Sequence, residues 1–509
     1  MAELLLEIAS EEIPARMQTK AAADLGRLLG AALEKAGLAL KDMRTFSGPR
    51  RLVFVADVPL SSPDITEERK GPRIGAPEQA LAGFMRGAGL DNISQAEIRS
   101  DKKGDYYVAV MKKSGQPASE IIAKAVPEIM SKFPWPKSMR SGDNPFRWVR
   151  PLSSILCVLA GKTVPFEVGG VKSGNTSFGH RRMGKGRFVC ENFRDYKSLL
   201  EQGRVMLDAD MRAQTILTDA RKICAETGLE LVEDMGLLDE VAGLVEWPVV
   251  ILGDMAPEFL QLPPEVIKLS MRSHQKYFAV RDPKTGALAP HFVVVANQEA
   301  PDGGEAIAQG NARVLSARLD DARFFETEDA KRPLESRYDE LDGVVFHQKL
   351  GTIKDKSERV AALARELAPS VGADPDKAEQ AARLAKCDLV TNMVVEFTSL
   401  QGTIGRLMYE REGGDHDIAL AIEDHYKPQG PSDRVPTNPV AIAVALADKL
   451  DTLVGFWAID EKPTGSKDPY GLRRAALGIV RIILENGIRL HIIRTIDKPM
   501  ILMLFKLWS

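Results

Sequence analysis

The stretch LLLEIASEEIPARMQTKAAADLGRLLGAALEKAGL (residues 4–38) decides the fold of the first part of the chain. Residues 4–8 form a short apolar run, which is typical of a β-strand. Within 17–38, apolar side chains recur at 21, 25, 28, 29, 32, 33 and 36, which is helical spacing. Residues 52–58 (LVFVADV) repeat the strand pattern. The sequence therefore predicts a strand, a helix and a second strand.

The remainder of the first 340 residues continues to mix short strands with helices. Residues 277–280 and 292–296 flank DPKTG (282–286), a good turn sequence, and so predict a hairpin-like pair. The order of the expected elements shows no regular alternation of strand, helix and strand. An α+β fold is therefore favoured over a doubly wound parallel sheet.

Beyond residue 340 the pattern becomes helical. Helical periodicity covers residues 356–367, 376–397, 440–457 and 470–485, and Pro375 beside Asp374 and Asp376 is typical of a helix start. We therefore predict an N-terminal α+β region over 1–165, a second α+β region over 166–340, an all-helical domain over 341–487 and an atypical tail over 488–509.

Composition limits the function classes. The 509 residues are 44% hydrophobic and 27% charged, an ordinary globular balance, and the net charge of −3 excludes a generally basic nucleic-acid-binding protein. Four scattered cysteines without a C-x-x-C pair point to a reducing compartment. The N-terminus carries acids where a signal peptide needs basic residues, and the apolar runs are too short to span a bilayer. We expect a cytoplasmic protein that does not interact with membranes.

Three segments nevertheless concentrate positive charge. Residues 168–190 contain no acid, residues 268–284 contain only Asp282, and residues 467–494 contain only Asp468 and Glu485. Lys and Arg beside His, Tyr and Phe suit a phosphate backbone and unstacked RNA bases. A solvated face with internal ion pairs is the alternative for each segment alone. Three such segments in one near-neutral chain favour RNA.

One constellation has the layout of a metal site. His347, the Cys387–Asp388 pair, Asp448 and Asp451 follow the order of the HD phosphohydrolases, in which two His and two Asp hold a divalent ion. Cys387 stands where the second His is required, and a neutral thiol is a poor ligand. We favour an HD-like helical fold without a metal, in which these residues serve as caps and internal hydrogen-bond partners. A metal-dependent phosphohydrolase is the alternative.

The sequence carries no self-contained nucleotide or hydrolase motif. Gly161-Lys162-Thr163 resembles the end of a P-loop, but Leu156 stands where its first glycine is required. Neither G-x-S-x-G nor H-E-x-x-H occurs.

A longer series of motifs resembles one family, the β subunit of bacterial glycyl-tRNA synthetase. The resemblance covers nearly all of residues 3–487 in the family order. It is carried by LLLEIASEEIPARM (4–17), GPRRLVFVADVP (48–59), TSFGHRRM (176–183), LLDEVAGLVEWPVVILG (237–253), LPPEVIKLSMRSHQKYFAV (262–280), GNARVLSARLDDARFFETED (310–329), FHQKLGTIKDKSERV (346–360), LAKCDLVTNMVVEFTSLQGTIGRLMYE (384–410), ALADKLDTLVGFWAI (445–459) and PTGSKDPYGLRRAALGIVRIILENG (463–487).

The resemblance implies an α2β2 enzyme that joins glycine to its tRNA with ATP and Mg. In that family the α subunit is the catalytic chain, while the β subunit mainly holds the tRNA and completes the assembly. We therefore expect this chain to bind an α subunit and tRNA(Gly), to bind no DNA, and to hold no cofactor or metal of its own. The candidate tRNA-binding residues are Arg181, Arg182, Arg272, His274, Lys276, Arg473 and Arg474.

The end of the chain departs from the family pattern. Members of the family continue past the ENG segment (485–487) into an anticodon-binding helical domain, whereas this sequence continues as residues 488–509 and stops. We expect the anticodon-binding domain to be absent. An inactive, truncated remnant that still binds RNA is therefore a further alternative.

Overall fold

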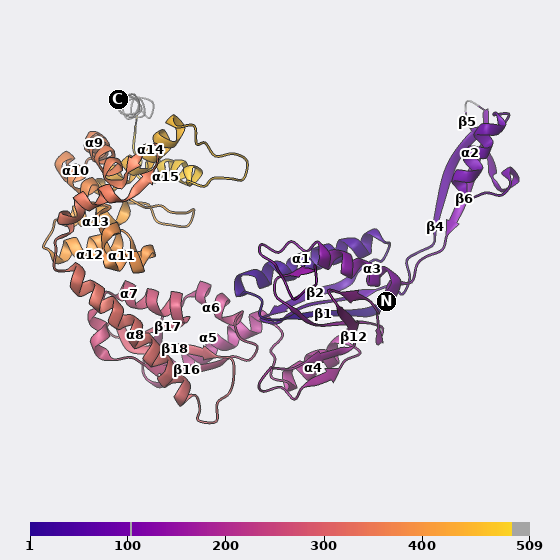
Figure 1. Cartoon of the computed structure of the whole chain (residues 1–509), viewed down its shortest axis with the longest axis horizontal. Helices are drawn as coiled ribbons and strands as arrows, with labels where there is room; N and C mark the ends of the chain where they lie inside the picture. The colour runs from indigo at the N-terminus through magenta and orange to yellow at the C-terminus, as the bar shows by residue number, and fades with distance from the viewer. Residues whose placement is uncertain (102–103, 491–509) are drawn as a thin grey trace. The chain divides into compact units, whose positions relative to one another are not determined.

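The computed structural model describes residues 1–101 and 104–490 of the chain, shown as a ribbon in Figure 1. These residues form two compact units, one made of Met1–Asp254 and Lys276–Asn311 and the other of Met255–Gln275 and 312–490. The first unit mixes strands and helices and the second is largely helical, which confirms the predicted α+β class. The boundaries predicted at residues 165, 340 and 487 stay predictions.

A seven-stranded sheet forms the centre of the first unit. Its strand order is β11-β12-β9-β1-β3-β2, with β10 paired to β9, and most neighbours are antiparallel. The strands are β1 (Ala2–Ser10), β2 (Lys41–Gly48), β3 (Arg51–Val58), β9 (Leu152–Leu159), β10 (Lys162–Thr163), β11 (Glu167–Val168) and β12 (Val171–Gly174). The strands predicted at 4–8 and 52–58 are confirmed as parts of β1 and β3.

Helices cover both faces of this sheet. On one face Leu4, Leu6 and Ile8 of β1 pack against α1 (Ala15–Lys35) and α3 (Ala118–Ser131). On the other face Leu5 packs against α4 (Phe193–Gln202). Successive strand residues point to opposite faces, so a strand buried on both sides needs a continuous apolar run. This explains why residues 4–6 are all leucine.

Two smaller sheets complete the main elements of the first unit. One has the order β15-β17-β18-β16 and packs with α5 and α6, and the other has the order β4-β6-β5 and packs with α2. The hairpin predicted across DPKTG is confirmed, because β17 and β18 pair antiparallel. The bounds are β4 (Ile65–Arg73), β5 (Glu97–Asp101), β6 (Gly104–Lys113), β15 (Glu230–Leu231), β16 (Val249–Asp254), β17 (Phe278–Arg281), β18 (Leu288–Ala296), α2 (Glu78–Ala88), α5 (Ala209–Glu226) and α6 (Met235–Ala242).

The remaining short strands form two-stranded pairs. In the first unit these are β7 (Met139–Arg140) with β8 (Arg147–Trp148), and β13 (Thr176–Phe178) with β14 (Arg187–Val189). In the second unit β19 (Val345–His347) pairs with β20 (Gly351–Thr352) directly before its helices.

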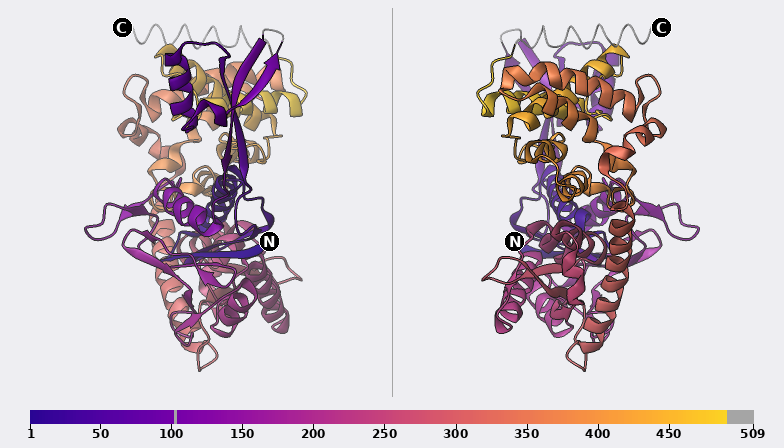
Figure 2. Two further views of the ribbon diagram at one scale, coloured as in Figure 1. Left: turned by 90° about the vertical axis from the view of Figure 1, so that its right-hand side faces the viewer. Right: turned by 90° about the vertical axis from the view of Figure 1, so that its left-hand side faces the viewer.

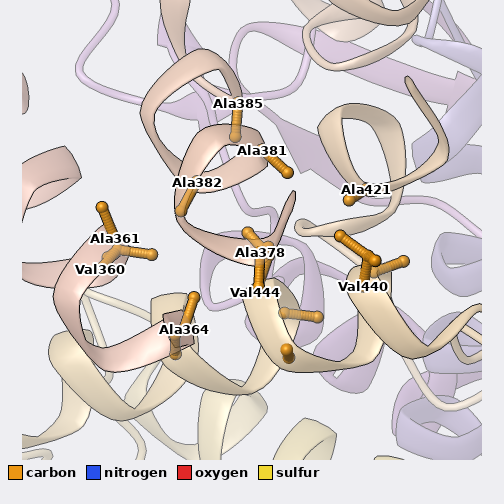
Figure 3. Packing of buried hydrophobic residues seen from close by; sticks show 14 of the residues in the cluster. Val360, Ala361, Ala364, Ala378, Ala381, Ala382, Ala385, Ala421, Val440 and Val444 are labelled. Carbon is orange, nitrogen blue, oxygen red and sulfur yellow. The ribbon is translucent and has the colours of Figure 1, made fainter. Parts of the chain in front are cut away.

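Small side chains let the helices of the second unit pack closely. Figure 3 shows the alanines of α9, α10 and α13 pointing toward one another and toward Val440 and Val444 of α14. Such small residues allow one helix to settle into the groove of the next. The helices are α7 (Pro264–Leu269), α9 (Ile353–Val371), α10 (Pro375–Leu384), α11 (Asn392–Glu396), α12 (Thr403–Arg411), α13 (His416–Asp424), α14 (Pro439–Ala458) and α15 (Leu472–Glu485).

The helix expected over 376–397 is interrupted. It consists of α10, a 3-10 turn at Cys387–Val390 and α11. Thr391 caps α11 by accepting a hydrogen bond from the Val394 N–H, while its hydroxyl donates to the Asp388 carbonyl. The start of α10 agrees with the sequence, because the Asp374 carboxylate caps the N–H groups of Asp376 and Lys377.

One helix contributes residues to both units. Figure 2 shows α8 (Glu305–Asp329) from two sides as a single long helix, and the division between the units falls within it, at residues 311 and 312. Within residues 1–101 and 104–490, no helix combines the length and the apolar character that crossing a membrane requires. Most of the predicted tail, 491–509, lies outside the described residues.

Candidate functional site

The four residues of the expected HD-like site lie in different environments. They are His347, Cys387, Asp388 and Asp448. His347 ends β19, where its ring packs edge-on against Phe456 and Tyr470, with centroids 5.4 and 5.7 Å away. Its Nδ1 accepts a hydrogen bond from the Lys349 N–H. Cys387 is buried, and its thiol donates to the Arg383 carbonyl at 3.5 Å. Burial raises the pKa of this thiol to about 12, so it is protonated at neutral pH.

Asp388 acts as an internal hydrogen-bond acceptor. One of its carboxylate oxygens accepts from the backbone N–H groups of Gly402 and Gly405 at 2.5 and 3.1 Å. These bonds join the turn at residues 387–390 to the start of α12. Burial raises the pKa of Asp388 to about 6 despite the two bonds. The sequence analysis expected Asp388 to serve as a cap or an internal hydrogen-bond partner.

Asp448 is surrounded by ammonium groups. Lys386 Nζ and Lys356 Nζ lie 3.0 and 3.4 Å from its Oδ1. Although burial alone would raise the pKa of Asp448, these lysines hold it well below its ordinary value. One turn further along α14, Asp451 pairs with Lys356 at 3.0 Å and with Arg359 at 2.7 Å.

A neutral histidine completes this cluster. The His425 Nδ1–H donates to the Ile422 carbonyl at 2.7 Å, which leaves Nε2 to accept from Lys386 at 3.0 Å. Burial, followed by the charge of Lys386, places the pKa of His425 well below 6.5. Burial also lowers the pKa of Lys449, to about 8, while its ammonium group donates to the carbonyls of His425 and Lys427.

These contacts place protein cations beside the carboxylates that the HD layout would offer to a metal. Residues 1–101 and 104–490 contain no group of three or more His, Cys, Asp or Glu side chains that could hold an ion. The arrangement can supply internal ion pairs and helix connections. It does not bring His347 into contact with Asp388 or Asp448 within the described part of the chain.

A second buried cluster lies in the first unit. The Arg51 guanidinium, 1% exposed, donates to Glu7 and Glu246, each at 2.9 Å, and to the Phe178 carbonyl at 3.2 Å. Although burial alone would lower the pKa of Arg51, Glu246 and Glu7 raise it above its ordinary value. Hydroxyl groups of Ser177 and Tyr196 donate to the same Glu7 carboxylate.

Sequence reasoning did not single out this cluster, although a signal was present. Glu7 interrupts the apolar run LLLEI, and Arg51 begins the apolar strand β3. A charge inside a strand that is buried on both faces requires an opposite charge. The same signal applies to Lys449 within the apolar helix α14, whereas nothing in the pattern marks His425.

The candidate RNA-binding residues of the first unit differ in availability. Arg181 is paired with Glu11 at 2.6 Å, and Lys276 is paired with Glu240 at 3.0 Å. Arg182 is exposed, and its guanidinium donates to the side chain of Gln298 at 3.3 Å without an acidic partner among the described residues. Two of these three cations therefore already have an acidic partner.

The other candidates lie in the second unit. Arg272 and His274 are exposed on the π-helical turn Ser270–Gln275, and the His274 ring contacts Phe397 edge-on. Arg473 and Arg474 are exposed in the first turn of α15. Arg473 donates to the Gly465 carbonyl at 2.6 Å, and neither arginine forms an ion pair with the residues that the structure describes.

The comparisons with known proteins agree on one family. A family model described as glycyl-tRNA synthetase beta subunit matches residues 4–504. The glycine–tRNA ligase beta subunit of Phenylobacterium zucineum is 56% identical over 502 residues, which cover 98% of this chain and 74% of the relative. The corresponding subunit of Ruegeria sp. is 52% identical, with 96% and 72% covered. That of Paracoccus denitrificans is 52% identical, with 98% and 74% covered.

These matches define the chain as a subunit of an aminoacyl-tRNA synthetase, a ligase. More narrowly, the chain belongs to the glycyl-tRNA synthetase β subunit family. The sequence-based recognition of this family is confirmed. The individual RNA-contact residues and the role of the HD-like residues stay predictions.

We expect Arg51→Met to lower the free energy of unfolding by about 3–5 kcal/mol, because it leaves Glu7 and Glu246 buried without their cation. Arg27→Met is the matched control, since Arg27 is exposed and, among the described residues, is paired only with Asp24 of the same helix. The control should cost less than about 1 kcal/mol. Urea denaturation of both variants measures the difference, and equal losses would show that the buried pairing is unimportant.

We expect Mg²⁺ or Mn²⁺ to leave the melting temperature of the chain within about 1 °C of its value in EDTA. A bound ion would stabilise the native state, and here lysine ammonium groups already neutralise Asp448 and Asp451. A metal-dependent rise that His347→Ala removes, together with phosphatase turnover, would instead support the phosphohydrolase alternative.

Proposed function

We propose that this chain binds tRNA(Gly) and assembles with a glycyl-tRNA synthetase α subunit into a tetramer that charges tRNA with glycine. The observation that carries the proposal is the family match over residues 4–504, together with relatives named as beta subunits of glycine–tRNA ligase. The name beta subunit, which these relatives carry, implies an alpha partner. The proposed role places the chain in the cytoplasm, with ATP, Mg and glycine bound by the α subunit.

In this role the chain positions the tRNA rather than performing the chemistry. Charging requires the glycine carboxylate to attack the α-phosphate of ATP and expel pyrophosphate. A hydroxyl of the tRNA 3′ end then attacks the glycyl carbonyl and releases AMP. Holding the acceptor end near the activated glycine makes the transfer step effectively unimolecular. Such positioning can lower the activation free energy by several kcal/mol.

Three exposed arginines are the best supported tRNA contacts. The guanidinium groups of Arg182, Arg473 and Arg474 form no ion pair with the described residues, so a phosphate would not have to displace one. Arg181 and Lys276 would first have to leave Glu11 and Glu240. We therefore rank the three free arginines above the two paired cations.

The proposal is tested by glycine charging of tRNA(Gly) with the α subunit alone and with α plus this chain. We expect charging to need both chains, because α alone lacks the tRNA-holding surface. If adding this chain does not stimulate charging while it still binds tRNA, the chain is the inactive RNA-binding remnant. Co-purification with α measures assembly separately.

We expect the double variant Arg473→Ala/Arg474→Ala to weaken tRNA binding and to reduce the slope of log K against log salt by about 1–2, since each phosphate contact releases counterions. Filter binding over a salt series measures the slope.

The matched control is Arg365→Ala/Arg383→Ala. Both arginines belong to the same unit, but Arg365 is held by Asp376 and Glu379, and Arg383 by Glu379. The control should keep the parental slope. If both double variants behave alike, the assignment of Arg473 and Arg474 is wrong.

A further inference from the structure

A groove runs along the outer side of α1 and α3, which lie side by side in Figure 1. Its volume is about 560 Å³. Leu28, Ala32 and Ala36 line it from the α1 side, and Ile121, Ala125 and Ile129 line it from α3. Each set repeats every four residues and therefore forms a ridge along its helix. All six side chains are partly buried.

These apolar residues are only partly used by the core, against which Ile121, Ala125 and Ile129 of α3 also pack. The inner faces of the same helices already bury Leu25, Leu29 and Leu33 of α1, and Ile122 and Val126 of α3, against the seven-stranded sheet. All six side chains keep part of their surface exposed in the groove between the two helices. Such a groove can receive the apolar face of a third helix.

The rim of the groove is positively charged. Among its described lining residues, Lys35, Lys124 and Lys132 face a single carboxylate, Glu128. Lys132 Nζ lies 2.9 Å from Glu128 Oε1. The pKa of Glu128 is lowered, first by Lys132 and then by Lys124 and Lys35. Three cations against one anion leave an excess of positive charge.

We propose that this groove binds an acidic amphipathic helix of a partner protein. The aliphatic face of that helix would pack between the two ridges, where Ala32, Ala36 and Ala125 leave room for its side chains. Glu and Asp on the flanks of the helix would pair with Lys35, Lys124 and Lys132. Helix-in-groove recognition uses this combination of apolar anchors and complementary charge.

The lining favours protein over RNA as the occupant. Single-stranded RNA is held by aromatic or arginine side chains on which bases stack. The described lining contains aliphatic residues, lysines, one glutamate and one glutamine, and none of its members is aromatic or arginine. Such a surface offers bases nothing to stack on, whereas Leu28, Ile121 and Ile129 suit leucine side chains.

The test uses the full chain and two labelled helical peptides of roughly 18 residues, a length at which helices begin to be stable. Both carry leucine at every fourth position of one face, flanked by glutamate in the first peptide and by lysine in the second. Fluorescence anisotropy should show the glutamate peptide binding at least about tenfold more tightly, with the difference shrinking at high salt.

Variants of the groove sharpen the test. Lys35→Glu/Lys124→Glu/Lys132→Glu should reverse the preference between the peptides, and Ala125→Trp should weaken binding of both by filling the groove. The matched control is Lys162→Glu/Lys197→Glu/Lys222→Glu, which makes the same charge change at exposed lysines outside the groove lining. The control should retain the parental preference. Circular dichroism and thermal melting confirm that each variant is folded.

Three results would overturn the proposal. The first is equal binding of the two peptides, or a preference that the lysine variant leaves unchanged. The second is displacement of the glutamate peptide by a single-stranded RNA oligonucleotide whose binding depends on the three lysines, which would make the groove an RNA surface. The third is self-association of the chain that the same variant abolishes, which would make a second copy the occupant.

Discussion

The buried pairing of Arg51 with Glu7 and Glu246 is the interaction on which the first unit depends. Removing a charged group from water costs several kcal/mol unless an opposite charge with good geometry meets it. The three residues come from β3, β1 and the segment that follows α6, and Ser177 and Tyr196 add hydroxyl donors from β13 and α4. The desolvation cost is offset only when these five segments come together. The cluster therefore favours one arrangement of these five segments. Apolar packing alone would define that arrangement less strictly.

The helical unit also depends on buried ion pairs, but here lysine ammonium groups surround carboxylates, whereas in the first unit carboxylates surround an arginine. Lys356 bridges α9 to Asp448 and Asp451 of α14, and Lys386 connects the turn after α10 to Asp448 and His425. Here ammonium groups perform the joining that a divalent ion performs in a metal site. Because an ammonium group accompanies the chain wherever it folds, this connection forms with the polypeptide and not with a separate ion.

Much of the fold could be predicted from local patterns. The apolar run at residues 4–8, interrupted by Glu7, and the helical pattern of 440–457 correspond to β1 and α14. Both are strongly apolar because β1 is buried on both faces and residues 440–447 of α14 are buried on all sides. The helix over 376–397 was predicted too long, since periodicity continues across the turn that points Asp388 at the amides of Gly402 and Gly405. That break is set by a contact with residues further along the chain, which a local window does not contain.

The candidate sites were harder to predict than the fold for a similar reason. The order of His347, Asp388 and Asp448 along the chain resembles a metal site, yet the side chains that meet Asp448 are Lys356 and Lys386. Which cation reaches which carboxylate depends on tertiary packing. Runs of positive charge located candidate RNA-binding surfaces, but the pairs Arg181–Glu11 and Lys276–Glu240 join residues from distant segments. Charge counts within a segment cannot reveal such partners.

The two compact units are interleaved along the chain, because residues 255–275 belong to the second unit while Lys276–Asn311 returns to the first. A ribosome therefore completes the first unit only after it has already made part of the second. A nascent chain that ends at residue 254 lacks β17 and β18, the two central strands of the four-stranded sheet. Completion of the four-stranded sheet during synthesis must wait until residue 296 has been made, and no single cleavage of the polypeptide yields either unit whole.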